Sequence, residues 1–499
     1  MATTEKAGWG TAVAATLFIF CLAADQVMMP LATSSVVQDL STNMRMVQIA
    51  IVLVSLVAAP LYITGSKLGD IHGKRKTFLI GAVLFVLGPV SAVITPNVVG
   101  LIVGWSVTKA LGMVLAVPAS IGLLLTTYPD DVQRRQAFTL YGAGGVIAAL
   151  AGPLLMGFSA QIASWRLPYG FLILILLLAL LLTSQSMQET EKVDAVTIDW
   201  GGTVLSFAAI AAILLGAILL AVPFLLSLLL AFLLIMVGVV ITAVLLKRLR
   251  KVAESGRHPL FQVGLFHNRI FLVAWGATLL AFALSGAIPF TIPVFTEQAL
   301  LFGSMQSALV MFAFAVGSVI LGFVSDQLLP WLAPRRLIQL FLIVMVMGLL
   351  WLAAVTSSQM TLMTFLLPML LVGAGFGVVG AQLPNIQLSD LLPEQQEEAS
   401  GLAELGKEVG IGLGTAVIGS IMFNIAISRF VENFTGWTGN LAQVSQEAFV
   451  AGFQGAVVIL AAIVFCALLL SFFLPDVSVE AVAAEEVREL LADVSSKRV

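Results

Sequence analysis

The sequence predicts an all-α integral membrane protein with fourteen transmembrane helices, arranged as two six-helix bundles plus a two-helix central insertion. Only 10% of the 499 residues are charged and 60% are hydrophobic, which leaves too few polar side chains to cover soluble domains. The hydrophobic residues occur in blocks of about twenty, the length that a helix needs to cross a membrane. The basic residues are concentrated in alternate loops. We therefore interpret the chain as lying mostly in lipid.

Windows of about nineteen residues identify the apolar stretches. The predicted spans are 10–31, 46–64, 77–95, 98–126, 136–160, 167–186, 202–221, 224–246, 270–294, 304–325, 336–355, 360–386, 400–427 and 449–474. The first stretch is too long for a secretory signal peptide and is interpreted as a retained helix. Because the number of spans is even, both termini are expected on the same side.

The positive charges indicate which side that is. Of the 24 Lys and Arg residues, nineteen lie in the termini and the loops on their side, and two, Lys109 and Lys407, lie inside spans. The other loops hold the remaining three, Arg45, Arg166 and Arg429. Positive charge is retained in the cytoplasm, so we expect both termini to be cytoplasmic.

Two polar segments, 188–199 and 247–268, divide the chain. They flank a helical hairpin that we expect to turn at Val222-Pro223. The sequence thus predicts an N-terminal six-helix bundle at 1–190, a central linker with two additional helices at 191–256, a C-terminal six-helix bundle at 257–476 and a cytoplasmic tail at 477–499.

Several kinds of function have no support in the sequence. The net charge is −3 and the basic residues form no single patch, which argues against nucleic-acid binding. The three histidines lie in predicted loops and the two cysteines in apolar runs, so we expect no metal, no cofactor and no disulfide. The glycine run at 375–380 fits a dinucleotide pattern by spacing, but no strand precedes it. The expected partners are the lipid bilayer, a small-molecule substrate and protons, and the protein is expected to be a monomer.

One loop pattern occurs twice, each time after the second span of a six-span set. An acidic residue is followed by a basic pair. The residues are Asp70, Lys74 and Arg75 in the first loop and Asp326, Arg335 and Arg336 in the second. Parallel six-helix repeats around a midplane substrate site are typical of one transporter architecture.

These features resemble the major facilitator superfamily, and within it the branch of fourteen-span drug/proton antiporters. The resemblance covers essentially the whole chain. The loop at 66–76 is similar to the family motif G-x-L-x-D-R-x-G-R-K, with Ser66 in place of the first glycine and Ile71 in place of the first arginine. The resemblance implies a bacterial inner-membrane protein with a cytoplasmic gate. The implied gate residues are Gly69, Asp70, Gly73, Lys74, Arg75, Asp326, Arg335 and Arg336.

The fifth span carries a second resemblance. Its segment at 152–157 is similar to the antiporter motif G-P-x-x-G-G, with Met156 in place of one glycine. The motif helix that this implies is built on Gly145, Gly152, Pro153 and Gly157. The fourth span departs from the family, because Ser106 takes the position of an arginine that is often assigned to proton coupling.

Two ionisable residues are predicted to lie deep in the membrane. Asp25 is fifteen residues into the first span and Lys109 eleven residues into the fourth, which places them about 22 Å and about 17 Å from opposite faces. An intramembrane charge costs about 2.5–3.5 kcal/mol on insertion scales, so a functional reason is expected. We hypothesise that Asp25 titrates or binds substrate and that Lys109 stabilises its ionised form. Alternatively, the two residues only satisfy each other or backbone carbonyls.

A second charged group lies near the start of the thirteenth span. Glu404, Lys407 and Glu408 have the spacing i, i+3 and i+4, which places them on one helix face. We interpret them as a cytoplasmic gate or proton relay in which two carboxylates share one cation. The alternative is a partly hydrated ion cluster at a helix end. In the resembled fold, Asp70 is expected to face the start of this helix.

The same span carries an edge of small residues. Its members are Gly406, Gly410 and Gly414. A glycine every four residues is typical of close helix packing. We expect this edge and the glycines of the fifth span to form contacts along which the two halves slide.

The expected function is a secondary active transporter that exports a hydrophobic or amphipathic small molecule in exchange for protons by alternating access. The sequence contains no G-x-x-x-x-G-K-[ST] loop for ATP, so an ion gradient is the expected energy source. One alternative is a uniporter or lipid-like exporter of the same fold without strict proton coupling, which the substitution at Ser106 favours. A membrane-embedded enzyme or sensor is the other alternative. It would need a nucleophile with a base, or a metal cluster, inside the membrane, and we find no such pattern.

Overall fold

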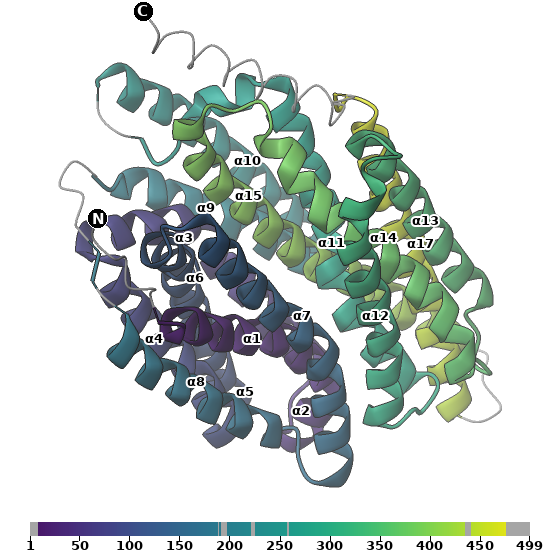
Figure 1. The fold of residues 1–499 in the computed structure, drawn as a ribbon. Coiled ribbons are helices and arrows are strands. Elements are labelled where there is room, and N and C mark those ends of the chain that lie inside the picture. Colours follow the sequence, from purple (N-terminus) through teal and green to yellow (C-terminus); the bar gives the residue numbers. More distant parts are fainter. Residues whose placement is uncertain are drawn as a thin grey trace, which may run out of the picture.

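The structure is all-helical in the part that it describes. In this computed structural model the described residues are 8–187, 189–190, 197–220, 225–256, 259–434 and 441–475. They contain fourteen helices that are long and apolar enough to span a membrane, which confirms the predicted fold class (Figure 1). The expected turn at Val222-Pro223 and the expected tail at 477–499 lie outside the described residues.

The first six spans and the insertion follow one another as α-helices, with one π-helical stretch, η1. These elements are α1 (Gly10–Leu31), α2 (Thr33–Asp39), α3 (Met44–His72), α4 (Lys74–Ile94), α5 (Val98–Gly100), η1 (Leu101–Val107), α6 (Thr108–Thr127), α7 (Asp131–Ile162), α8 (Leu167–Ser186), α9 (Trp200–Leu219) and α10 (Leu225–Glu254). The short α2 lies between the first two spans, and α5, η1 and α6 together form the fourth.

The last six spans follow a short 3₁₀ turn, η2. These elements are η2 (Val263–His267), α11 (Arg269–Gln298), α12 (Ser304–Leu328), α13 (Pro334–Val355), α14 (Leu362–Leu388), α15 (Pro393–Leu413), η3 (Gly414–Ile418), α16 (Gly419–Phe434) and α17 (Leu441–Ser471). The thirteenth span is formed by α15, the π-helical η3 and α16.

Several helices extend beyond the predicted apolar stretches. Helix α7 begins at Asp131, whereas its predicted span begins at 136, because Asp130 caps it by accepting a hydrogen bond from the N–H of Gln133 at 3.0 Å. Asn43 caps α3 in the same way. Hydropathy detects the part of a helix that lies in lipid, while capping side chains decide where the helix starts.

The first six and last six spans repeat the same packing. Helix α1 packs on α7 and α8, as α11 packs on α15 and α17, and α4 packs on α6 and α8, as α13 packs on α14 and α17. Figure 1 shows the two groups as a purple-to-blue half and a green-to-yellow half. The halves meet along two equivalent lines of contact, α3 with α15 and α7 with α12, which we call the two seams.

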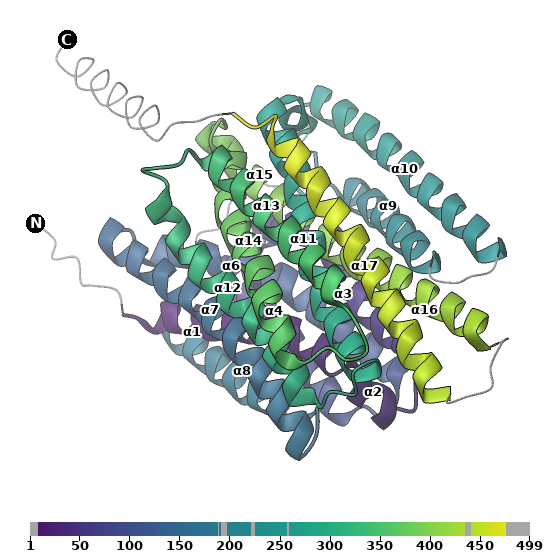
Figure 2. The ribbon, with the colours of Figure 1, turned by 90° about the vertical axis from the view of Figure 1, so that its right-hand side faces the viewer.

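The insertion covers one of these seams. Helix α9 packs on α3 and also on α15, and α10 packs on α9. Figure 2 shows α9 and α10 at the edge of the molecule, with α10 outermost. The Thr203 hydroxyl of α9 lies 2.9 Å from that of Thr64 on α3. The insertion is therefore attached along the α3–α15 seam.

We call the side on which α1, α4 and α13 begin the basic side, because Lys74 and Arg75 lie at the start of α4 and Arg335 lies at the start of α13. The other side is called the opposite side.

Candidate functional site

A buried ion pair joins α1 to the fourth span. Lys109 Nζ lies 2.5 Å from Asp25 Oδ2, and the two residues are 2% and 0% exposed. The long lysine side chain bridges the difference in depth that the sequence predicts. The two residues therefore meet, while their role in transport stays a prediction.

Trp105 completes this site, and the sequence analysis did not identify it. Its indole N–H donates a hydrogen bond of 3.0 Å to Asp25 Oδ1, and Lys109 Nζ lies 4.5 Å from the centre of its ring. Trp105 belongs to the π-helical η1, a kind of segment that is frequent at functional sites. The sequence signal for this role was the spacing: Trp105 lies four positions before the intramembrane Lys109, which places both on one helix face.

Ser106 occupies the position at which the resemblance places an arginine. The residue is fully buried, and its hydroxyl has no hydrogen-bond partner among the described residues. Lys109 lies three positions further along the chain. The fourth span thus carries its positive charge about one turn away from the expected position.

The three charges of the thirteenth span make different direct contacts. Lys407 Nζ lies 2.6 Å from Glu404 Oε1, but Glu408 Oε2 accepts a hydrogen bond of 3.0 Å from Ser55 on α3. Lys407 thus pairs directly with Glu404, while it acts on Glu408 only through the electrostatic field, and the shared role of the three residues stays a prediction. One further residue rotates the side chain by about 100° around the helix, and this turns Glu408 into the α3–α15 seam.

The glycine edge of this span packs closely, but inside its own half. Its members are Gly406, Gly410 and Gly414. A Cβ added at any of them would meet α11, and at Gly414 it would overlap the carbonyl oxygen of Ala283. The expectation of a sliding contact was therefore wrong for this edge. Gly412 faces the other half instead, since its Cβ would lie 3.0 Å from Ser55 Cβ.

The loop motif after α3 forms a local network. Lys74 Nζ lies 3.5 Å from Asp70 Oδ1, and Gly69 is buried one turn before Gly73. Gly73 has a φ of +97°, which side chains other than glycine rarely adopt. Lys74 is thus the ion-pair partner of Asp70 among the described residues, and the expectation that Asp70 faces the start of the thirteenth span stays a prediction.

A carboxylate from the end of the first half caps α4. Glu189 accepts hydrogen bonds from the N–H groups of Arg75 and Lys76 at 3.1 and 3.2 Å. The Arg75 side chain donates to the carbonyl of Ser184 at 2.9 Å. An anion at a helix N-terminus is favoured by the helix dipole, so Glu189 holds the motif against the end of α8.

The second copy of the loop pattern makes different contacts. Asp326 accepts a hydrogen bond of 2.8 Å from Gln382 on α14, and Arg335 donates one of 2.9 Å to the carbonyl of Phe472 after α17. Arg336 follows at the start of α13. These contacts fasten α12 and α13 to neighbours within their own half.

The motif helix α7 makes contacts in both halves. Gly152, next to the buried Pro153, would place a Cβ 3.3 Å from the backbone of Ala24 on α1. A Cβ added at Gly157 would meet the Cβ of Ala308 on α12, across the second seam. Gly145 has nothing within 4 Å of its added Cβ. Of these three glycines, Gly157 makes the expected contact between the halves, Gly152 packs closely within its own half, and the expectation was wrong at Gly145.

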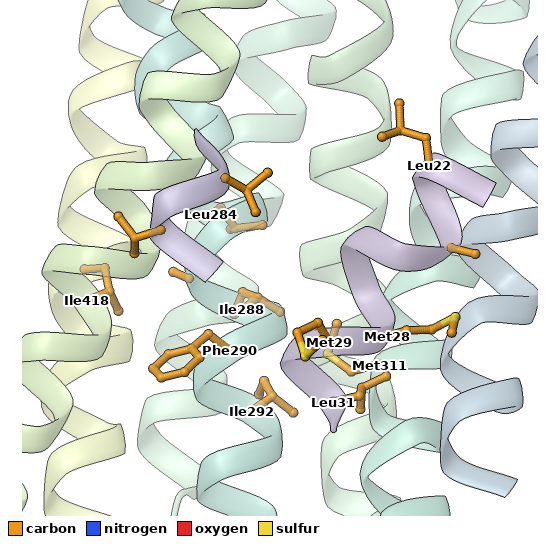
Figure 3. Close-up of a cluster of buried hydrophobic side chains, with 14 of the residues drawn as sticks. Leu22, Met28, Met29, Leu31, Leu284, Ile288, Phe290, Ile292, Met311 and Ile418 are labelled. Atoms are coloured by element: carbon orange, nitrogen blue, oxygen red, sulfur yellow. The ribbon is translucent and has the colours of Figure 1, made fainter. Parts of the chain in front are cut away.

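An apolar cluster joins the halves toward the opposite side. Figure 3 shows Met29 of α1 directed toward Ile288 and Ile292 of α11, with Leu31 near Met311 of α12. All of these side chains are buried. Helix ends from both halves thus meet in an apolar contact.

A carboxylate that the sequence analysis missed, Glu297, lies in the last turn of α11, beyond the predicted span at 270–294. It interacts with Ser34 of α2 and Ser307 of α12. The next residue, Gln298, also donates to Ser34, at 3.5 Å. The window ended before Glu297, so hydropathy gave no signal for it.

Two segments of the chain, residues 14–202 and 197–415, match the sequence profile of the Major Facilitator Superfamily. The chain belongs to this superfamily. It is therefore a transporter and an integral multi-pass membrane protein, not an enzyme, and the packing of its halves repeats because the superfamily fold is built from two six-helix units.

Curated relatives of this superfamily member are transport proteins at low identity. Multidrug resistance protein 3 of Bacillus subtilis (strain 168) is 22% identical over 454 residues, covering 87% of this chain and 85% of that protein. Cephamycin export protein CmcT of Amycolatopsis lactamdurans is 26% identical over 421 residues, covering 80% and 82%.

Solved structures with the superfamily fold superpose over nearly the full length. A bacterial homologue of the human lysosomal transporter Spinster, in an inward-facing and unoccupied conformation, has a TM-score of 0.64 at 14% identity and covers 93% of this chain and 97% of that chain. A peptide transporter POT in complex with sulfate has a TM-score of 0.64 at 14% identity, covering 95% and 98%. At this identity the likeness concerns the fold.

Proposed function

We propose that this superfamily member exports a hydrophobic or amphipathic small molecule in exchange for protons. The observation that carries the proposal is the buried Asp25–Lys109 pair, with Trp105 bonded to the same carboxylate. An ionisable pair at this depth is costly, so a functional role is its default explanation. The relatives named for multidrug resistance and cephamycin export support the substrate class and the direction of transport.

Asp25 is the proposed proton carrier. When it is ionised, it holds Lys109 and the indole N–H of Trp105. When it takes up a proton, Lys109 loses its counter-ion in a buried site, which is unfavourable. Lys109 then favours a conformation in which it meets water. The substrate is proposed to bind while Asp25 is ionised, so that a proton on Asp25 displaces it and the two compete for one site, as exchange requires.

The movement is proposed to be a rocking of two bundles, 1–190 and 257–476, on either side of the linker at 191–256. The loop motif at Asp70 and its second copy at Asp326 would form the cytoplasmic gate. Glu404, Lys407 and Glu408 would contribute to proton coupling. The unequal distribution of basic residues supports cytoplasmic termini, in the inner membrane of a bacterium, and the transporter is proposed to act as a monomer.

The test is export from proteoliposomes across a panel of compounds, with and without a pH gradient. Asp25→Asn and Lys109→Gln should each reduce gradient-driven export by on the order of a hundredfold, since each removes a group that acts in the coupled step. Asp131→Asn and Lys251→Gln are matched controls at exposed positions and should leave export unchanged. Full activity of both test variants at equal protein would refute the proposed role of the pair.

Uniport of a lipid-like compound without strict proton coupling is the second candidate. Its supporting observation is Ser106, an uncharged residue at the position of the expected arginine. Export that persists after the pH gradient is collapsed would favour this candidate over exchange.

A further inference from the structure

We propose that Ser55 transmits the protonation state of Glu408 from the second half of the transporter to the first. The proposal rests on the proposed function. Its basis is the hydrogen bond of 3.0 Å that the Ser55 hydroxyl donates to Glu408 Oε2. The two residues are 3% and 5% exposed, and they belong to α3 and α15, one helix from each half.

This bond differs from two neighbouring bonds that α3 makes with η3, the continuation of α15. Nearer the opposite side, the Gln48 amide donates to the carbonyl oxygens of Thr415 and Ala416 at 2.7 and 3.3 Å. Neither an amide nor a carbonyl titrates. Of these three hydrogen bonds between α3 and the thirteenth span, the one between Ser55 and Glu408 therefore responds to a proton.

Helix α9 shields the bond from the bilayer. A Cβ on Gly412, one turn after Glu408, would lie 3.0 Å from Ser55 Cβ and 3.2 Å from Leu214 Cδ1 of α9. Leu214 is fully buried. Since this environment excludes water and lipid, the strength of the hydrogen bond depends strongly on the charge of its acceptor.

The charged and titratable groups around Glu408 come from four helices. Glu404 and Lys407 act on it from α15 and Lys109 from α6. Tyr62 lies near it on α3, and Tyr141 of α7 interacts with Tyr62. Lys109 is also the partner of Asp25. A proton on Asp25 thus releases a positive charge that already acts on Glu408, which connects the buried pair to the seam.

The direction of the effect follows from hydrogen-bond strength. Ionised Glu408 accepts a charge-assisted bond, which is roughly twice as strong as a neutral one. Protonated Glu408 offers a weaker acceptor to the same hydroxyl. High pH therefore holds α3 to α15, and low pH loosens the seam.

The experiment measures the distance between spin labels on the two halves at about pH 5 and about pH 9. The labels replace Val99 and Met363, which are exposed at equivalent helix starts on the opposite side, after Cys466→Ser removes the exposed thiol. We expect the ratio of the two distance populations to change by on the order of tenfold between these pH values. Ser55→Ala and Glu408→Gln should each abolish most of that change.

Three further variants separate this role from general weakening of the seam. Ser55→Thr keeps a hydroxyl and should restore the pH response. Gln48→Leu removes the two bonds from Gln48 to η3 and should keep the pH response. The double variant Ser55→Ala with Glu408→Gln should behave like either single one, because both changes act on one bond.

Two results would overturn the proposal. One is that Ser55→Ala keeps the pH response unchanged, and the other is that Gln48→Leu loses the response as fully as Ser55→Ala does. Export measurements keep this test apart from that of the proposed function. If export does not follow the pH gradient but the pH response requires Ser55, proton exchange is refuted and the role of Ser55 stands. If export is gradient-driven and Ser55→Ala responds normally to pH, the role of Ser55 alone is refuted.

Discussion

At the scale of single residues, the Asp25–Lys109 pair affects stability as well as transport. Breaking a buried pair leaves an uncompensated charge and costs about 3–5 kcal/mol, whereas replacing both partners by apolar residues is often neutral. We expect Asp25→Leu and Lys109→Leu each to lower the free energy of unfolding by about that amount. The double variant should be close to the unchanged protein. Thermal unfolding in detergent measures this, and additive losses would contradict it.

Trp105 tests the geometry of the same site. Trp105→Phe keeps an aromatic ring beside Lys109 but removes the N–H that bonds Asp25. A hydrogen bond to a charged group contributes about 1.5–3 kcal/mol, so export should fall by on the order of tenfold. Trp331→Phe is the control, because Trp331 is 82% exposed. Equal export by both variants would mean that the indole N–H is not required.

At this scale the sequence predicts those residues that differ in polarity from the apolar run around them. Asp25 and Lys109 are conspicuous because they interrupt apolar runs, and the long lysine side chain can bridge the difference between their predicted depths. Ser55 is not conspicuous, since serine is common in membrane helices and its meaning comes from Glu408, which is 353 positions away. Glu297 lies just beyond an apolar window. The partner of Glu408 depends on a rotation of about 100°, which spacing does not reveal when several neighbouring helices are possible.

At the scale of helices, Asp199 links the two helices of the insertion. It accepts hydrogen bonds of 2.7 and 2.8 Å from Arg248 of α10 and one of 2.9 Å from the N–H of Gly202 at the start of α9. Burial acts to raise the pKa of Asp199, but these bonds outweigh it and hold the pKa below the usual 3.8.

The pH dependence of this link has a definite sign. Because the pKa of Asp199 is lower in the folded protein, its stabilising contribution is complete above 3.8 and is lost as the pH falls through the folded value. Asp199→Asn should therefore lower the thermal unfolding temperature at neutral pH, with a difference that shrinks in acid. Arg250→Gln is the control on an exposed position of α10. A difference that does not depend on pH would contradict the assignment.

Gly73 joins α3 to α4 in a backbone conformation that requires glycine. Gly73→Ala should lower stability by about 1–2 kcal/mol for the positive φ, and by more because the added Cβ would meet the carboxylate of Glu189. Gly256 has a φ of +73° with nothing within 4 Å of its added Cβ. Gly256→Ala therefore carries the backbone effect alone. Unfolding measurements should therefore give Gly256→Ala a clearly higher free energy of unfolding than Gly73→Ala.

The order of the helices and the repeat of the two halves could be predicted from the sequence, because apolar length and alternating charge report them directly. The direction of a small-residue edge could not. Gly414 packs on α11 of its own half while Gly157 packs on α12 of the other, although both lie on glycine-rich spans. Glycine allows close approach by any neighbour, so the pattern itself does not identify the neighbour.

For the molecule as a whole, relative movement of the halves requires small side chains where α7 contacts α12, the second seam. Gly157→Leu would push a large side chain against Ala308 and Ser304 of α12. We expect export to fall at least tenfold while the fold is kept, because the change affects contact between halves rather than within one. Gly170→Leu on α8 is the control, since nothing lies within 4 Å of its added Cβ. Equal export by both variants would exclude a moving contact at Gly157.

The position of the insertion makes the molecule asymmetric toward its lipid surroundings. On one flank α9 lies over the line where α3 meets α15. At the other seam α7 packs on α12, and each of these helices carries an exposed phenylalanine, Phe158 at 57% and Phe323 at 61%. The two seams therefore present different surfaces to a compound dissolved in the bilayer: one covered by α9, the other formed by α7 and α12 themselves.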